Sequence, residues 1–465
     1  MLQSCIRILQ VGDIHLPEWE KVYSHIDDKD KNYSPSIIAD IRGLDNMTAV
    51  LQRLAQLGTS SQTDAVAFMG DFTTRGDTDK IPVAIEILST LMTRFDGSRV
   101  PMFGVPGNHD VDKKEAILHG SQAKFSPLER AFQKFGWLSP PINRARKVEI
   151  ESDDSSLSLS LINTSIGSWS AHLLPDILEA EFSEDKLSEA PLSQTTDRVG
   201  ENAPDGDLLD STQVGTRSDQ LFAMDVPFIS KGTTASLRKE FSENSDKDTH
   251  VIIGHHNILP QKIPRITPYG EMLNAGMFRR YLQNTGRNVV YLHGHIHDDP
   301  IEIIGSPAFE KGSQAYSMLD SGKIVSISAP PIWEGFNEVT FFLDEDNQVY
   351  LLRVTKYRLD ENMEIGNYSD QETVYIPLLQ SVSDLLGTST RKVLQALKEQ
   401  RSSSNPTGTI KWTDFLTYLN EKSVTSDAEE VERSVLKLFC GGLVRINNLG
   451  REPVRWALRL SEVEA

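Results

Sequence analysis

Aspartate, asparagine and histidine residues stand directly after apolar runs at several distant places in this sequence. Taken singly, each has a structural explanation, because polar side chains at the end of a strand commonly form turns. Such residues follow several strands of one predicted sheet, and this recurrence is improbable by accident. The pattern therefore favours a shared site. The residues concerned are Asp13, His15, Asp71, Asn108, His255, His295 and His297.

These residue types share one chemistry, which is the binding of divalent metal ions. Carboxylate, imidazole and amide oxygen groups are ligands for Mn, Fe, Zn or Mg, and a carboxylate such as Asp71 can bridge two ions. Two ions about 4 Å apart stabilise the attacking and leaving oxygens of a phosphoryl displacement and lower the pKa of a bound water. Thiolate ligation is excluded within one chain, because the only cysteines, Cys5 and Cys440, lie near opposite ends. We therefore expect a two-metal hydrolytic centre for phosphate esters, with Mn²⁺ favoured over Fe, Zn or Mg.

The elements that must position these residues have the pattern of an α/β sheet. Short runs rich in Val, Ile and Leu end at polar, glycine-containing turns, as expected of buried strands. Amphipathic stretches with apolar residues at helical spacing lie between them. The ligand candidates then fall at the strand ends, where such sheets bind their ligands. The strand candidates are CIRILQVGDIH, DAVAFMGD, MFGVPGNHD, SLSLINTS, THVIIGHH and NVVYLHGHIH, and the helix candidates are NMTAVLQRLAQLG and PVAIEILSTLMTRF.

Two further regions complete the expected catalytic domain, residues 1–380. Residues 169–232 are acidic, rich in serine and poor in aromatic residues, which is typical of a surface insertion or a lid without catalytic residues. After the last histidine-rich strand, three stretches alternate like the strands of a second sheet: KIVSISAPPI, FNEVTFFLD and QVYLLRVTKYRL. A chain of 465 residues is too long for one core of ordinary size, so a smaller additional domain is expected.

The motifs D-x-H, GD, GNHD, GH and GHxH occur in this order, and together they resemble the calcineurin-like metallophosphoesterase superfamily. The resemblance covers approximately residues 7–345. It implies a two-sheet α/β sandwich flanked by helices, with two metal ions at the strand ends. It also implies an assignment of the ligands: Asp13, His15 and His297 to the first metal, Asn108, His255 and His295 to the second, and Asp71 to both.

Three further residues have roles implied by the resemblance. The family places the equivalent of His109 near the substrate, where it stabilises the transition state or protonates the leaving oxygen. A general acid of this kind contributes about 10²- to 10⁴-fold in rate. Asp110 is expected to orient His109. Arg75 occupies the place of a phosphate-binding arginine, although a surface arginine on a loop would give the same pattern.

The adjacent histidines in IIGHHNIL compete for one ligand position, and Asn257 stands where many relatives have proline. If the strand continues to His255, neighbouring side chains point to opposite sides, so only one of the pair can face the metals directly. We expect His255, which directly follows the glycine, to be the ligand. His256 is then expected to contact the substrate, together with Asn108 and His109.

The stretch VYLHGHIHDD has three histidines in alternate positions. The resemblance assigns His295 and His297 to different ions, and Gly294 allows the backbone to approach and turn at the strand end. His293 precedes this glycine and relatives do not require it. We expect His293 to be buried, where it can orient a ligand by hydrogen bonding.

The C-terminal segment, residues 381–465, has the pattern of a small winged-helix-like α+β domain. Three amphipathic helices are predicted in VSDLLGTSTRKVLQALKEQ, KWTDFLTYLNEK and DAEEVERSVLKLFCGGL. Two strands around an Asn-Asn-Leu-Gly turn follow in LVRINNLGREPVRWALRLS. The hairpin has Arg445, Arg451, Arg455 and Arg459, and positive wings contact phosphate in many such modules. Because the charge of the whole segment is roughly balanced, binding of a protein or of a second copy is an equal alternative.

The motif style GDFTTRGD is most similar to that of phosphodiesterases of the cyclic-nucleotide type. We therefore expect hydrolysis of a phosphodiester, in a nucleotide or a nucleic acid, by a metal-activated water. A nuclease guided by the C-terminal domain, and a phosphoesterase whose C-terminal domain serves assembly or regulation, are the alternatives. A net charge of −19 argues against a surface that binds nucleic acid throughout. Neither a signal peptide nor a membrane span is recognisable, so a cytoplasmic location is expected.

Overall fold

Two six-stranded sheets pack face to face in the computed structural model and form a sandwich. The model describes residues 5–15, 35–73, 79–94, 96–112, 115, 123–152, 155–166, 227–244, 248–259, 272, 274–296, 300–305, 322–344, 346–359, 372–378, 387–404, 408–425 and 427–461. The expected acidic insertion at 169–232 therefore lies almost wholly outside the described residues. The expected α/β sandwich is confirmed.

The first sheet, called here the β1 sheet, has β1 near its centre, parallel to β2 and antiparallel to β10. Its strands in spatial order are β12 (Glu372–Pro377), β11 (Val349–Arg358), β10 (Gly335–Leu343), β1 (Cys5–Val11), β2 (Ala65–Phe68) and β3 (Met102–Gly104). The second sheet, called the β7 sheet, has a parallel centre of β5, β6, β7 and β9. Its order is β4 (Arg146–Ser152), β5 (Ser155–Leu161), β6 (Thr249–Ile253), β7 (Asn288–His293), β9 (Lys323–Ser328) and β8 (Ile301–Gly305).

This topology corrects two expectations about sheet membership. The motif-bearing strands do not share one sheet: β1, β2 and β3 lie in one sheet, and β5, β6 and β7 lie in the other. The three later strand candidates do not form a second sheet of their own either, because β9 pairs with β7 while β10 pairs with β1. Each strand was recognisable from its apolar run, but apolar periodicity does not encode which strand becomes its neighbour.

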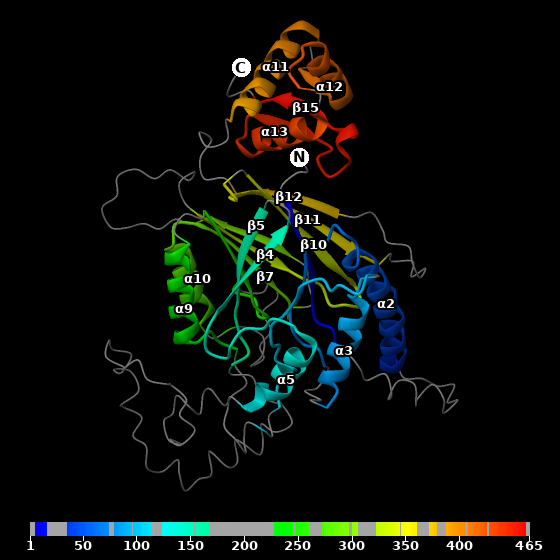
Figure 1. The fold of residues 1–465 in the computed structure, drawn as a ribbon, viewed down its shortest axis with the longest axis vertical. Coiled ribbons are helices and arrows are strands. Elements are labelled where there is room, and N and C mark those ends of the chain that lie inside the picture. Colours follow the sequence, from blue (N-terminus) through cyan, green and yellow to red (C-terminus); the bar gives the residue numbers. More distant parts are fainter. Residues whose placement is uncertain are drawn as a thin grey trace.

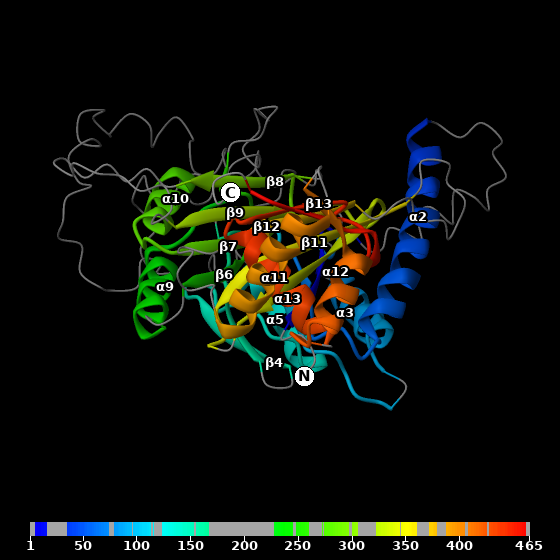
Figure 2. The ribbon, with the colours of Figure 1, turned by 90° about the horizontal axis from the view of Figure 1, so that it is seen from above.

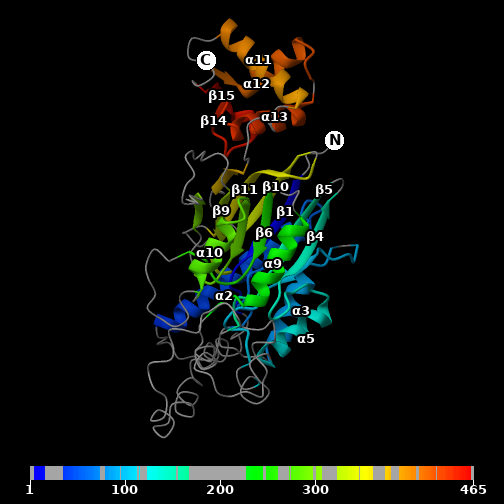
Figure 3. The same ribbon diagram turned by 90° about the vertical axis from the view of Figure 1, so that its left-hand side faces the viewer.

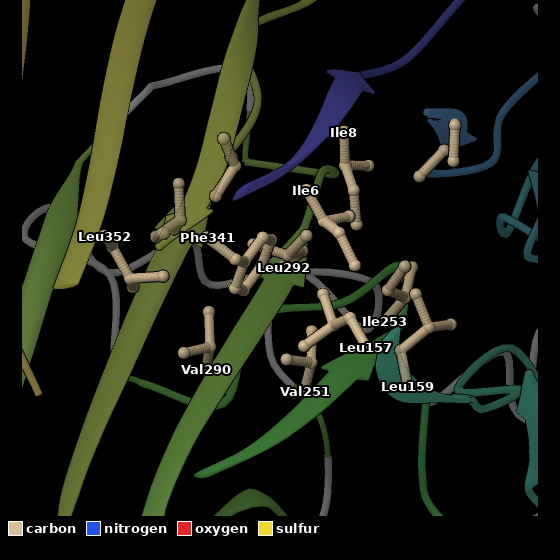
Figure 4. Packing of buried hydrophobic residues seen from close by; sticks show 14 of the residues in the cluster. Ile6, Ile8, Leu157, Leu159, Val251, Ile253, Val290, Leu292, Phe341 and Leu352 are labelled. Carbon is tan, nitrogen blue, oxygen red and sulfur yellow. The ribbon is translucent and has the colours of Figure 1, made fainter. Parts of the chain in front are cut away.

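The interior between the sheets is filled by alternate side chains of both. Ile6 and Ile8 of β1 face this interior together with Phe341 of β10, and Val251 and Leu292 approach from the β7 sheet (Figure 4). Alternation along each strand sends the intervening residues to the outer faces. Both faces of the central strands are therefore buried, which explains why their sequences are continuous apolar runs.

Helices cover the outer faces on both sides (Figures 1 and 3). The β1 sheet is covered by α2 (Pro35–Gly58), α3 (Ile81–Leu91) and α5 (Ser126–Phe135), the last preceded by the short helix η1 (Ala123–Phe125). The β7 sheet is covered by α9 (Lys231–Glu243) and α10 (Ala275–Gln283). Prolines near the starts of α3 and α5 favour helix initiation, and Gly136 ends α5 with a left-handed conformation. The predicted helices at 46–58 and 82–95 lie within, or largely overlap, α2 and α3.

The C-terminal module, described as residues 387–461, is a compact unit of three helices and a three-stranded sheet. Its elements are α11 (Thr388–Ser404), β13 (Thr409–Lys411), α12 (Trp412–Glu421), α13 (Ala428–Cys440), β14 (Val444–Asn447), η3 (Pro453–Arg455) and β15 (Ala457–Leu460). The three helices and the β14–β15 hairpin lie where they were predicted. The short strand β13 was not predicted, and it pairs with β15.

The module packs on the outer face of the β1 sheet, at the end where β1 begins (Figures 1 and 2). Phe342 and Leu351 point outward there, because they alternate with interior residues of β10 and β11. They join the core of the module around Trp412, Phe415 and Val435. The module and the two-sheet sandwich thus share a buried apolar interface.

Candidate metal centre

Five strands end in short turns that carry the candidate ligands. Gly107 and Gly294 illustrate why these turns contain glycine. A Cβ atom at Gly107 would lie 2.1 Å from Oδ1 of Asp71, and one at Gly294 would lie 2.7 Å from Oδ1 of Asp13. The backbone of each turn therefore approaches a carboxylate of another turn more closely than any other residue would permit.

Three candidate ligands adopt the left-handed backbone conformation that L-residues normally avoid. The φ angles are +47° at His15, +51° at Asp71 and +69° at His295. Such residues cost of order 1 to 3 kcal/mol each and concentrate at functional sites. The surrounding fold therefore holds these side chains in place at a cost in stability, as expected of a prearranged binding site.

Asp13, His15 and Asp71 form one cluster, whose possible ligand atoms lie within 4.8 Å of one another. The backbone fixes this cluster, because the carbonyl of Asp71 accepts hydrogen bonds from the N–H groups of Ile14 and His15 at 3.0 and 2.8 Å. Both carboxylates are almost completely buried. Burial would raise the pKa of Asp71, but the nearby imidazoles of His255 and His109 outweigh it and hold that pKa well below its usual value.

His255 joins this first cluster to the residues on the β7 sheet. Its Nε2 atom lies 3.1 Å from Oδ1 of Asn108 and 3.4 Å from Oδ2 of Asp71, while its Nδ1 atom lies 2.5 Å from the carbonyl oxygen of Met69. Burial alone would lower the pKa of His255, but the charge of Asp71 and its hydrogen bond raise it from 6.5 to about 9. A bound metal ion would have to displace this proton.

The second cluster contains His255, His256 and His295, and its possible ligand atoms also lie within 4.8 Å of one another. The backbone N–H of His295 donates to Oδ1 of Asp13 at 3.0 Å. This hydrogen bond links the turn after β7 directly to the turn after β1. The two clusters are adjacent, because His255 contacts Asp71.

The condition on which only one of His255 and His256 was expected to face the metals is not met. Strand β6 ends at Ile253, before the pair, so the alternation of side chains in a strand does not apply to them. The ring of His256 lies 4.6 Å from that of His255 and 4.5 Å from that of His295, measured between ring centroids. Burial and the neighbouring histidines keep the pKa of His256 well below its usual value.

His109 and Asp110 occupy different parts of the GNHD turn. The His109 ring lies at the half-buried edge of the site, edge-on to His15 with 5.3 Å between ring centroids. The buried Asp110 carboxylate accepts hydrogen bonds from the backbone N–H groups of Phe72, Thr73 and Gly107, at 2.7, 3.3 and 3.0 Å. Burial and the charge of Asp71 raise the pKa of Asp110 to about 7. Asp110 thus joins two motif turns, and any orienting effect on His109 would act through the backbone.

Two of the expected site residues, Arg75 and His297, lie outside the described residues, so their roles stay predictions. His293 is buried as expected, and its ring hydrogen-bonds to Ser326 and to the carbonyl of Gly294. Burial lowers the pKa of His293 to about 4, so this ring is neutral.

Three residues at the site were missed by the sequence reasoning. Gln10 bridges the two sheets beneath the site, where its Nε2 donates to the carbonyls of His293 at 3.0 Å and Ile327 at 2.8 Å. A polar residue inside the apolar run of β1 was the available signal. Thr164 contacts His256, and the ring of Trp333 lies 5.8 Å from that of His15. No local pattern marks these two residues, because their partners are distant in the sequence.

The donor set fits a pair of divalent cations. Buried carboxylates and imidazoles converge in two adjacent clusters, and Asp71 of the first contacts His255 of the second. Buried charges of this kind are retained where they pair or coordinate metals. Oxygen and nitrogen donors without thiolate suit Mn, Fe, Zn or Mg.

Residues 6–172 match the family model described as calcineurin-like phosphoesterase. This segment of the chain is therefore similar to a calcineurin-like phosphoesterase domain. The matched segment contains the motifs with Asp13, His15, Asp71 and Asn108, and it ends before His255. No curated protein matches the chain significantly.

Several solved structures were found to be similar at low sequence identity. One is a dimetal phosphatase from Danio rerio, with 12% identity, a TM-score of 0.37, and coverage of 80% of this chain and 99% of that chain. A putative 5′-nucleotidase from Staphylococcus aureus has 11% identity and a TM-score of 0.38, with 86% of this chain and 59% of that chain covered. A 5′-nucleotidase precursor from Thermus thermophilus has 9% identity and a TM-score of 0.32, with 80% and 54% covered. This chain thus spans little more than half of either nucleotidase.

The family match and the two ligand clusters agree on a coarse function. They support metal-dependent hydrolysis of a phosphoester, and each of the two clusters could hold a metal ion. Among the described residues, no helix is long and apolar enough to cross a membrane.

Proposed function

We propose that this protein is a phosphodiesterase that acts on a nucleotide or a related small phosphodiester. The main support is the convergence of two possible ligand clusters, one from each sheet, which touch where His255 contacts the carboxylate of Asp71. We assign Asp13, His15, Asp71 and His297 to the first ion, and Asn108, Asp71, His255 and His295 to the second. The residues outside the described part, Arg75 and His297, enter this assignment from the sequence motifs alone.

Two bound divalent ions would supply the positive charge that stabilises the attacking and leaving oxygens and lowers the pKa of a water molecule. The chain's own contribution is to hold the ligand side chains in place before the metal ions bind. Asp71 accepts a hydrogen bond from the backbone N–H of His109, and Asp13 accepts one from the backbone N–H of His295. His109 stands at the edge of the site beside His15, where a ring nitrogen can protonate the leaving oxygen. Arg75 is proposed to bind the phosphate.

Trp333 supports a substrate with a nucleobase. Its loop is tied to the site, because the backbone N–H of Ile332 donates to the carbonyl of Asp13 at 3.0 Å. The indole is partly exposed and lies beside the ring of His15. Nucleobases stack on such aromatic surfaces with a contribution of about 1 to 3 kcal/mol per base.

The primary test is hydrolysis by the purified protein loaded with Mn²⁺. We expect turnover of bis(p-nitrophenyl) phosphate and of cyclic mononucleotides in a panel that also contains dinucleotides and single- and double-stranded nucleic acids. Absence of phosphodiester hydrolysis in protein that demonstrably contains metal would refute the proposal. For the nucleobase, Trp333→Ala should reduce kcat/KM about tenfold for a nucleotide and little for a glycerophosphodiester, with Trp333→Phe as the matched control.

The position of the C-terminal module bears on the alternative of a guided nuclease. The module contacts the start of β1 near Cys5, whereas Asp13 follows the other end of that strand. Eight residues of extended chain span about 26 Å. The β14–β15 hairpin, with its four arginines, is thus unfavourably placed to present nucleic acid to the metals of the same chain.

We propose residues 1–380 as the catalytic domain and residues 381–465 as a winged-helix-like domain that serves assembly or partner binding. The winged-helix interpretation is supported by the order of helices and strands. Deletion of the module would expose Phe342 and Leu351, so charge substitutions are the cleaner test. One double variant, Arg445→Ser/Arg455→Ser, removes two charges of the hairpin, and a second, Arg391→Ser/Lys392→Ser, is the control in α11. Weaker nucleic-acid binding in the first variant but not in the second would favour the nuclease. Light scattering of the same variants reports on self-assembly.

A further inference from the structure

Thr164 and His256 form a buried pair beside the metal centre. Thr164 follows β5 and His256 follows β6, and neither side chain is accessible to solvent. The Oγ1 atom of Thr164 lies 3.1 Å from the backbone nitrogen of His256 and 2.8 Å from its Nδ1. Tyr291 donates its hydroxyl to the carbonyl of His256 at 2.6 Å. The main chain and the ring of His256 are therefore both held.

The protons of this pair can be assigned from its hydrogen bonds. The backbone N–H of His256 can only donate, so Oγ1 of Thr164 accepts from it. A threonine hydroxyl has one proton of its own, and within the described part of the chain Nδ1 of His256 is the acceptor in reach. The reverse arrangement, with Nδ1 as the donor, would leave a buried hydroxyl proton without an acceptor, which is unfavourable. Nδ1 is therefore the unprotonated nitrogen, and the proton of the neutral ring is on Nε2.

The second ring nitrogen of His256 is Nε2, because Nδ1 faces Thr164. It is buried and has no hydrogen-bond partner among the described residues. A ring nitrogen of His256 lies within 4.8 Å of the possible ligand nitrogens of His255 and His295, and the centroid of the His256 ring lies 4.6 and 4.5 Å from the centroids of those two rings. A buried donor without a protein partner, next to a binding site, is explained by a partner that arrives with the substrate.

We propose that Thr164 fixes His256 as the Nε2–H tautomer, and that His256 thereby donates a hydrogen bond to an oxygen of the bound phosphoryl group. Thr164 is a positioning residue in this scheme and His256 contacts the substrate. A protonated Nε2 has no lone pair to offer a metal, so the tautomer distinguishes His256 from its neighbour His255. The donor gains strength as negative charge grows on the phosphoryl oxygens in the transition state. This inference rests on the proposed phosphodiesterase function.

The matched pair Thr164→Val and Thr164→Ser tests the role of the hydroxyl in the full-length, Mn²⁺-loaded protein. Valine has the shape of threonine without the hydroxyl, so we expect kcat for bis(p-nitrophenyl) phosphate to fall about 10²-fold, as when one such donor is lost. Thr164→Ser should restore kcat to about the wild-type value, because it keeps the hydroxyl. Mn²⁺ affinity, measured by calorimetry, should be unchanged in both variants. Unchanged kcat in Thr164→Val would overturn the proposal.

Two measurements that do not depend on turnover complete the test. Nitrogen-15 NMR of the Mg²⁺-loaded protein should show the His256 ring protonated at Nε2 in the wild type and a tautomer mixture in Thr164→Val. His256→Ala should retain both Mn²⁺ ions with unchanged affinity, whereas loss of one ion would show that His256 is a ligand and would overturn the proposal. If the wild type binds Mn²⁺ but hydrolyses no phosphodiester, the proposed function fails while these two measurements still decide the tautomer.

Discussion

The two ends of strand β1 place opposite demands on the chain. Where β1 begins, Phe342 and Leu351 pack against the apolar core of the C-terminal module. Where β1 ends, buried carboxylates and imidazoles crowd together, and His15 and Asp71 have positive φ angles. The packing at the first end raises the free energy of unfolding. The strained backbone at the second end lowers it, while holding the candidate metal-binding side chains in place. Substitutions at the two ends should therefore have separable effects on stability and on hydrolysis.

The largest expected effect is on catalysis at the ligand end. Asp71→Ala removes the carboxylate of the first cluster that contacts His255 of the second. Metal-centred stabilisation of several kcal/mol corresponds to about 10³-fold or more in rate. We expect metal-dependent hydrolysis to be abolished while the circular dichroism spectrum stays native. Retained hydrolysis in Asp71→Ala would refute the whole assignment of the site.

The complementary change lies at the module end. Leu351→Ala creates a cavity between β11 and the C-terminal module, and such changes cost about 2 to 5 kcal/mol. We expect a lower free energy of unfolding in urea, with kcat/KM unchanged at concentrations where the protein is folded. A loss of kcat/KM in the folded variant would show that the two ends are coupled.

The pH dependence of stability should change sign when metal is bound. His255 has a pKa raised from 6.5 to about 9, so its contribution in the metal-free protein is complete below pH 6.5 and is lost as the pH rises through 9. The unfolding free energy should fall by at most about 1.4 kcal/mol per pH unit in this window. With Mn²⁺ the opposite slope is expected, because ligation requires the unprotonated ring. Thermal unfolding can be measured as a function of pH in two samples, one with Mn²⁺ and one with a chelator. The same dependence of stability on pH in both samples would contradict the prediction.

The smallest effect concerns backbone strain away from the ligands. Ser423 has a φ of +53° at the end of α12 and is exposed. Ser423→Gly should raise the free energy of unfolding by about 1 kcal/mol, because glycine tolerates this conformation. Hydrolysis should not change, which sets this strain apart from that at His15 and Asp71. Urea titration of the variant and the wild type measures the difference.

The sequence predicted the strands and most of the ligand turns, because apolar runs that end in Gly and Asp or His are local signals. It did not predict that β10 inserts beside β1, or that the ligands come from two facing sheets. Strand pairing depends on contacts between segments far apart in the chain, which periodicity does not record. The contact between His256 and Thr164 was not predicted for the same reason, since the two residues are 92 positions apart.

The origin of the ligands on both layers of the sandwich has a consequence for how activity is acquired. Neither layer alone has a complete set of ligands, because Asp13, Asp71 and Asn108 follow strands of one layer and His255 and His295 follow strands of the other. Bound cations would therefore act as a cross-link that clasps the two layers together. A nascent or truncated chain that ends before β7 would remain inert, so hydrolysis becomes a reporter of completed folding.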